Sequence, residues 1–130
     1  MIEQDCVFCK IVKGEIPVRK IWEDKKYLAF LDQSPINAGH TLIIPKEHTE
    51  DIFDLKDGEY KKLMLAAKKV AKLLKEKLTP KKVGIMVEGF AISHTHVHLI
   101  PLNKSGELNP ERARLSNVEE LNIIAEKITK

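Results

Sequence analysis

Three histidines alternate with other residues in His94-Thr95-His96-Val97-His98, which leads into the run Leu99-Ile100-Pro101. A period of two is typical of a β-strand, in which every second side chain lies on the same face. We therefore expect one strand over residues 94–101, with the three imidazoles on one face and roughly 6.5 Å apart. Each ring carries a donor and an acceptor, so the row suits a phosphate or a metal ion better than an apolar core or a plain solvent-exposed face.

An imidazole nitrogen is also a good nucleophile for phosphorus. Its reference pKa of about 6.5 leaves the ring mostly neutral at pH 7, and the neutral ring can attack phosphorus. A phosphoramidate formed with the ring would be opened by water in a second step. One difficult displacement would thus be divided into two easier ones.

The two cysteines of the chain, Cys6 and Cys9, form a C-x-x-C pair. A disulfide between them would close too small a loop to stabilise the fold, so the spacing predicts metal ligation or redox chemistry. A thioredoxin-like site would follow a strand and begin a long helix. Nothing upstream of Cys6 is long enough to form that strand.

Length and charge limit the class of protein. At 130 residues we expect a single domain over residues 1–130. The net charge of +3 is mildly basic, and lysines and acidic residues are interleaved, which favours an anionic ligand weakly and argues against nucleic acid as a partner. No apolar run approaches the ~20 residues that span a membrane, and the acidic start Met1–Asp5 is unlike a signal peptide, so we expect a cytoplasmic protein.

Hydrophobic periodicity predicts an α+β fold with an antiparallel sheet of about five strands, one long helix packed on it, and a C-terminal helix. We expect a short helical segment at 6–13, strands at 20–23, 27–31, 40–45, 83–87 and 94–101, a long amphipathic helix at 54–78, and a final helix to Ile128. The final helix would begin at a capping box, Ser116-x-x-Glu119. The open edges of such a small sheet favour a homodimer.

Four further segments accompany the alternating histidines, in the order Cys6–Val12, Gly14–Pro17, Phe30–Pro35 and Gly39–His48. With the histidines, the chain resembles the histidine triad (HIT) family, whose signature is His-φ-His-φ-His-φ-φ with φ apolar. The four segments resemble blocks of its Hint-like branch, in the same order. The resemblance covers about residues 6–102 and leaves 103–130 as a C-terminal extension. Thr95 is a polar departure at a φ position, although threonine suits a strand.

The resemblance implies a nucleotide hydrolase or transferase that acts on the α-phosphorus of nucleoside monophosphate conjugates. It implies His96 as the nucleophile, with His98 donating to the phosphoryl oxygens and His40 holding the triad by hydrogen bonds. Asp32 would bind the ribose diol, although from sequence alone an ordinary turn aspartate is the simpler interpretation. Purine nucleotide phosphoramidates or dinucleoside polyphosphates are the expected substrates.

The same resemblance implies an apolar slot for the base, although apolar residues in such patterns usually form core. Its members would be Phe8, Ile11, Ile16, Phe30 and Leu42. The chain departs from the family before the triad, because Phe90 and Ala91 stand where the Hint-like branch has polar residues. Ser93 and backbone N–H groups would then serve as phosphate donors.

Cys6, Cys9, His48 and His94 together would form a Cys₂His₂ set, as in many HIT proteins. A closed set of four such ligands predicts a structural zinc ion. His94 would then turn towards the N-terminal segment, while His96 and His98 face the phosphate.

Two other functions compete with the nucleophile hypothesis. His94, His96 and His98, with His40, could instead hold a catalytic metal that activates water, as in a metal-dependent hydrolase. A nucleotide-binding protein without catalysis is the third possibility. Dependence of turnover on added metal, and the effect of replacing His96, would separate the three.

Overall fold

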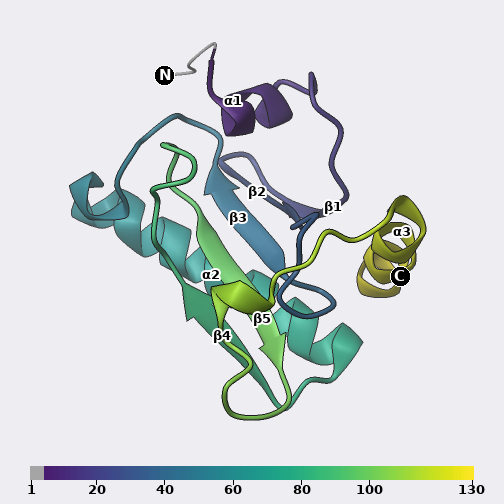
Figure 1. Cartoon of the computed structure of the whole chain (residues 1–130). Helices are drawn as coiled ribbons and strands as arrows, with labels where there is room; N and C mark the ends of the chain where they lie inside the picture. The colour runs from purple at the N-terminus through teal and green to yellow at the C-terminus, as the bar shows by residue number, and fades with distance from the viewer. Residues whose placement is uncertain (1–4) are drawn as a thin grey trace.

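The computed structural model describes residues 5–130 and contains one five-stranded antiparallel sheet (Figure 1). The strands lie in the order β1-β2-β3-β5-β4, with β1 at Lys20–Glu23, β2 at Tyr27–Leu31, β3 at Thr41–Pro45, β4 at Lys82–Met86 and β5 at Val97–Leu102. The predicted fold class is confirmed. Met1–Gln4, part of the N-terminal segment considered above, lie outside the described residues.

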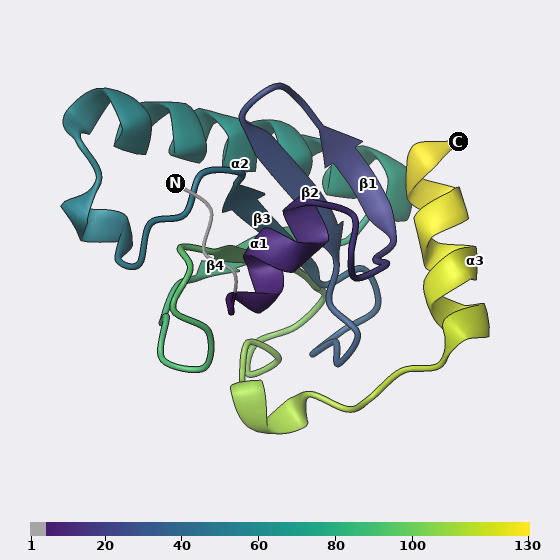
Figure 2. The same ribbon diagram turned by 90° about the horizontal axis from the view of Figure 1, so that it is seen from above.

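Three α-helices accompany the sheet: α1 at Val7–Val12, α2 at Asp57–Leu78 and α3 at Val118–Thr129. Two short 3-10 helices, η1 at Ile52–Asp54 and η2 at Pro110–Arg112, lie in the connections. In Figure 2 the long helix α2 lies on one side of the sheet and α1 on the other, while α3 stands beside β1. No helix among residues 5–130 is long and apolar enough to cross a membrane.

Strand register places two different rows of side chains on the two faces. Ala29 pairs with Ile43 and Ile43 with Val97, and all three belong to the buried cluster that packs against α2. In the neighbouring row, Phe30 pairs with Leu42 and Leu42 with His98. Because successive side chains alternate between faces, this second row lies on the α1 side. On that face, the apolar side chains of Phe30 and Leu42 therefore lie in one row with His98.

The long helix begins later than its periodicity suggested. Residues 52–54 form η1, whose first turn is capped by the Asp51 side chain accepting from Phe53 N–H, and α2 starts at Asp57. Acidic Asp57 and Glu59 in the first turn stabilise the positive end of the helix dipole. The helix ends at Leu78, before Thr79-Pro80, as predicted.

Two further predicted boundaries were wrong. β5 begins at Val97 rather than at residue 94, because Thr95 is held by the loop after β3: its N–H and its hydroxyl both donate to the carbonyl of Thr49. The last helix is capped by Asn117, whose Oδ1 accepts from Glu120 N–H, so the capping box at Ser116 does not form. Ser116 instead donates its hydroxyl hydrogen to the Glu120 carboxylate.

Candidate active site and metal centre

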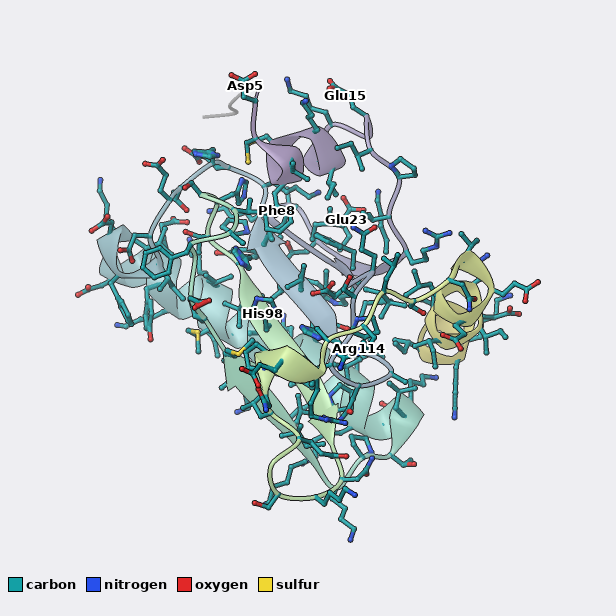
Figure 3. All side chains as sticks on the ribbon, in the orientation of Figure 1. Asp5, Phe8, Glu15, Glu23, His98 and Arg114 are labelled. Carbon is teal, nitrogen blue, oxygen red and sulfur yellow. The ribbon has the colours of Figure 1, made fainter. Side chains whose placement is uncertain are left out.

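A cavity of about 400 Å³ opens on the α1 side of the sheet. Eight of the residues predicted for catalysis or substrate binding line it together, and they come from α1, the loop after it, β2 and the residue that follows it, β3, and β5 and the residue that precedes it. They are Phe8, Ile11, Ile16, Phe30, Asp32, Leu42, His96 and His98. Figure 3 labels Phe8, on α1, and His98, on β5, the two elements between which this cavity lies. The histidines predicted for phosphate chemistry and the residues predicted for an apolar slot thus line the same cavity.

The apolar end of the cavity is also a small core. Phe8 meets Phe30 edge to face with ring centroids 5.8 Å apart, and the same Phe8 ring meets His96 at 5.1 Å. Ile11, Phe30 and Leu42 are buried in this cluster. The interpretation as core is confirmed for these residues, and the interpretation as a slot for the base stays a prediction, compatible with their position in the lining of the cavity.

His96 has its tautomer fixed by the backbone. Its Nδ1 lies 2.7 Å from the carbonyl oxygen of His94, which can only accept, so Nδ1 carries the hydrogen. The lone pair of the neutral ring is therefore on Nε2. The residue is buried, with 7% of its surface exposed, and lines the cavity. Such a nitrogen is a nucleophile ready for an electrophilic phosphorus.

His40 and His98 are joined by a hydrogen bond, and both carry their ring hydrogen on Nε2, whereas His96 carries it on Nδ1. The backbone N–H of Ile36 donates to Nδ1 of His40 at 3.0 Å, so in the neutral ring Nε2 of His40 carries the hydrogen. That Nε2–H donates to Nδ1 of His98 at 2.9 Å. His98 must then carry its own hydrogen on Nε2, which makes it a donor. Two neighbouring rings therefore offer different groups, a lone pair on His96 and an N–H on His98.

Burial keeps the rings of His40 and His98 neutral. It lowers the pKa of His98 to about 4, with a smaller effect of the charges of His40 and His96. Burial also lowers the pKa of His40, while the nearby Asp32 carboxylate opposes that shift. At neutral pH both rings are uncharged, so the tautomers described above are the relevant ones.

Asp32 and His40 are held together by the loop between β2 and β3. The Asp32 N–H donates to the carbonyl of His40, and Asp32 Oδ1 accepts from Ser34 N–H. The second oxygen, Oδ2, lies 3.6 Å from Nε2 of His40 and keeps acceptor capacity for a substrate hydroxyl. Gly39, with φ of 91°, permits this turn, and an added Cβ there would overlap the Leu78 side chain.

A second constellation joins three separate segments of the chain. Cys6 Sγ lies 3.3 Å from Nδ1 of His94, and Cys9 Sγ lies 3.5 Å from the same nitrogen and 3.4 Å from Nδ1 of His48. The four ligand atoms all lie within 4.8 Å of one another. His94 Nε2 donates to the carbonyl of Pro45, which leaves Nδ1 free as a ligand. The donor set and its compactness fit a tetrahedral zinc ion.

The prediction that all three triad rings share one face was wrong. His94 precedes β5, is fully buried and turns to the cysteines, whereas His96 and His98 line the cavity. Among the described residues, no group that could hold a metal combines His94 with His96 and His98.

A different group, Asp32, His40 and His98, is compact enough for an ion. There the Ile36 N–H holds His40 in the tautomer whose Nε2 is protonated, which opposes ligation by that nitrogen. The catalytic-metal hypothesis therefore loses support from two observations: His94 lies apart from His96 and His98, and Nε2 of His40 carries a hydrogen.

The residues that line the cavity differ in part from those predicted. Ser93 is exposed and is not among the residues that line the cavity. Met86, which pairs with His98 across the sheet, does line it, and hairpin register could have indicated this. Pro110 and Leu121 line the cavity from the C-terminal extension, and no sequence signal pointed to them.

Comparison with known proteins identifies the family of the chain. The model of the HIT domain matches residues 13–105. The adenosine 5'-monophosphoramidase of Schizosaccharomyces pombe is 39% identical over 101 residues, 74% of this chain and 73% of that protein. The chain belongs to the HIT family.

Solved structures of two bacterial proteins have the same fold. A Hit-like protein from Bartonella henselae has a TM-score of 0.84 and 27% identity, covering 99% of this chain and 98% of that one. A zinc-bound histidine triad family protein from Mycobacterium smegmatis has a TM-score of 0.79 and 28% identity, covering 95% and 93% of the two chains. Assignment to the Hint-like branch stays a prediction.

Proposed function

We propose that the protein hydrolyses nucleoside monophosphate conjugates, with purine nucleoside phosphoramidates as its principal substrates and dinucleoside polyphosphates as weaker ones. The observation that carries the proposal is the hydrogen bond from His96 Nδ1 to the His94 carbonyl, because it leaves the Nε2 lone pair free beside a donor on His98. The fission-yeast relative, an adenosine 5'-monophosphoramidase, supports this substrate class.

In the first step, Nε2 of His96 attacks the α-phosphorus and forms an N–P bond. The P–N bond to the leaving amine breaks, and the leaving nitrogen keeps the electron pair and takes a proton from water. His98, as an Nε2–H donor, stabilises the negative charge on the phosphoryl oxygens. Because the His40 ring holds the other nitrogen of His98, this donor is fixed in orientation before substrate arrives.

In the second step, water attacks the same phosphorus from the side that the amine has left. The N–P bond breaks and its electron pair returns to Nε2 of His96. The water oxygen stays on phosphorus, and its proton goes to solvent. The nucleoside monophosphate is released and the ring is neutral again. Asp32 would hold the ribose hydroxyls through both steps, with Phe8 and Phe30 beside the base.

The metal centre has a structural role in this proposal. A zinc ion would link the start of α1, the loop after β3 and the segment before β5 through Cys6, Cys9, His48 and His94, and would supply rigidity. Thiolate ligands require reduced cysteines, which fits a cytoplasmic location. A homodimer is also part of the proposal.

A substrate panel tests the function. Purified protein is incubated with adenosine and guanosine phosphoramidates and with dinucleoside polyphosphates, with and without EDTA in the assay. We expect nucleoside monophosphate release from phosphoramidates without added metal. Loss of turnover in EDTA with rescue by a divalent metal would favour the metal-dependent hydrolase instead. Binding of nucleotides without any release would favour the non-catalytic alternative.

A further inference from the structure

The segment after β4 carries a carboxylate into the cavity. Glu88 lines the cavity together with His96 and His98. Met86 pairs with His98 across the sheet, and Glu88 follows Met86 by two residues, the spacing that returns a side chain to the same face in an extended chain. The same antiparallel register, continued past the end of β4, would bring Glu88 opposite His96.

The charged side chains of the lining are Arg19, Asp32 and Glu88, and they come from different parts of the sheet. Arg19 precedes β1, beside Leu31 and close to Asp32, and its side chain is held by Asn122. Glu88 follows β4, and β1 and β4 are the two edges of the sheet. No described side chain forms an ion pair or hydrogen bond with the Glu88 carboxylate. Two carboxylates therefore flank the histidines, Asp32 beside His40 and His98 and Glu88 on the β4 side, and the Glu88 carboxylate is open to a positively charged ligand.

The Glu88 carboxylate lies in the part of the cavity that is left for the leaving group of a substrate. The apolar slot takes up the part of the cavity formed by α1, β2 and β3, with Asp32 at the end of β2. On the β4 side of His96 and His98 the wall is formed by residues 88–92, where Gly89, Ala91 and Ile92 contribute no charged or polar side chain. A group attached to the phosphorus on this side meets the Glu88 carboxylate as its charged neighbour.

We propose that Glu88 is a specificity residue that selects conjugates whose leaving group carries a positive charge, such as phosphoramidates of diamines or of lysine-like amines. Opposite charges attract across the cavity, whereas a polyphosphate leaving group would be repelled. This inference rests on the proposed function, since it concerns the leaving group of the same reaction.

Three adenosine 5'-phosphoramidates test it, with leaving amines of matched length: 1,4-diaminobutane (cationic), n-pentylamine (neutral) and 4-aminobutyrate (anionic). We expect kcat/KM at low ionic strength to fall in that order, with a factor of about five between the cationic and neutral substrates, as for one partly exposed ion pair. The preference should shrink in high salt. In Glu88→Gln the ratio of the three values should approach one.

The matched control is Glu76→Gln, which removes the same charge from an exposed position on α2, away from the cavity. It should keep the wild-type order of the three substrates. Equal kcat/KM for all three substrates in the wild type would overturn the inference, as would an unchanged preference in Glu88→Gln that thermal melting shows to be folded. Absence of hydrolysis with all three in the wild type would instead contradict the proposed function itself.

Discussion

At the scale of single residues, main-chain groups decide what each histidine can do. The His94 carbonyl accepts from His96 Nδ1, the Pro45 carbonyl accepts from His94 Nε2, and the Ile36 N–H donates to His40 Nδ1. Each contact leaves one defined nitrogen for chemistry or ligation. Four imidazoles of the same type thereby acquire different expected roles: metal ligand, nucleophile, donor and support.

Replacing His96, the proposed nucleophile, separates catalysis from binding. In His96→Asn we expect kcat to fall by a factor on the order of 10⁴ or more, because the covalent route is lost. Affinity for the nucleoside monophosphate, measured by calorimetry, should change little because the apolar slot and Asp32 remain. Turnover near the wild-type rate in this variant would contradict the assignment of His96.

The low pKa of His98 predicts a pH dependence of stability. In the folded protein burial lowers this pKa to about 4, whereas the unfolded chain has a value of about 6.5. Between these values the unfolded state binds more protons, so stability falls as the pH drops from about 6.5 towards 4 and is unaffected by this group above that range.

Thermal melting at pH 7.5 and pH 5 measures the effect. The loss of Tm on acidification should be smaller in His98→Asn than in the wild type, and zinc release, common to both, cancels in the comparison. An equal loss in the two proteins would rule out the linkage.

At the scale of elements, periodicity and turn residues predicted most of the fold. The hairpin of β1 and β2, strand β3 and the body of α2 lie where their patterns placed them. The start of β5 could not be predicted, because the pairing of Thr95 with Thr49 depends on a loop that sequence periodicity does not describe. The alternation of the three histidines alone gave no indication that His94 turns away, whereas the Cys₂His₂ set implied by the family resemblance did.

The proposed metal centre belongs to the same scale because its four ligands come from three separate segments of the chain. Cys6→Ser or Cys9→Ser should lower the free energy of unfolding by about 3 kcal/mol, or Tm by ~10 °C, through loss of the bound ion. Turnover at low temperature should fall less, because the variant keeps the cavity. Elemental analysis checks the premise: zinc per chain near zero in wild-type protein purified without chelator would contradict it.

At the scale of the whole molecule, the C-terminal extension is part of the site's frame. Arg114 and Ser116 donate their N–H groups to the carbonyls of Pro35 and Gln33, in the loop that follows Asp32. Figure 1 shows this segment crossing from η2 to α3, which stands beside β1. Sequence reasoning left residues 103–130 outside the core, because such main-chain contacts carry no side-chain signature.

The two edges of the sheet differ, which bears on assembly. β1 is flanked by α3, whereas among the described residues no strand pairs with the outer edge of β4. Ile85 on β4 is 47% exposed. We predict a dimer that covers this edge, and Ile85→Lys should shift light-scattering mass towards the monomer. Only monomer in the wild type at micromolar concentration would contradict the prediction.

The most direct test of the account is capture of the covalent intermediate. A phosphoramidate substrate is mixed with enzyme, quenched within milliseconds under alkaline denaturing conditions that preserve N–P bonds, and the protein is examined by intact mass and peptide mapping. The account predicts a transient mass increase of one nucleoside monophosphoryl group, located on His96 and absent in His96→Asn. Product accumulation with no such adduct at any time point, or an adduct on another residue, would contradict it.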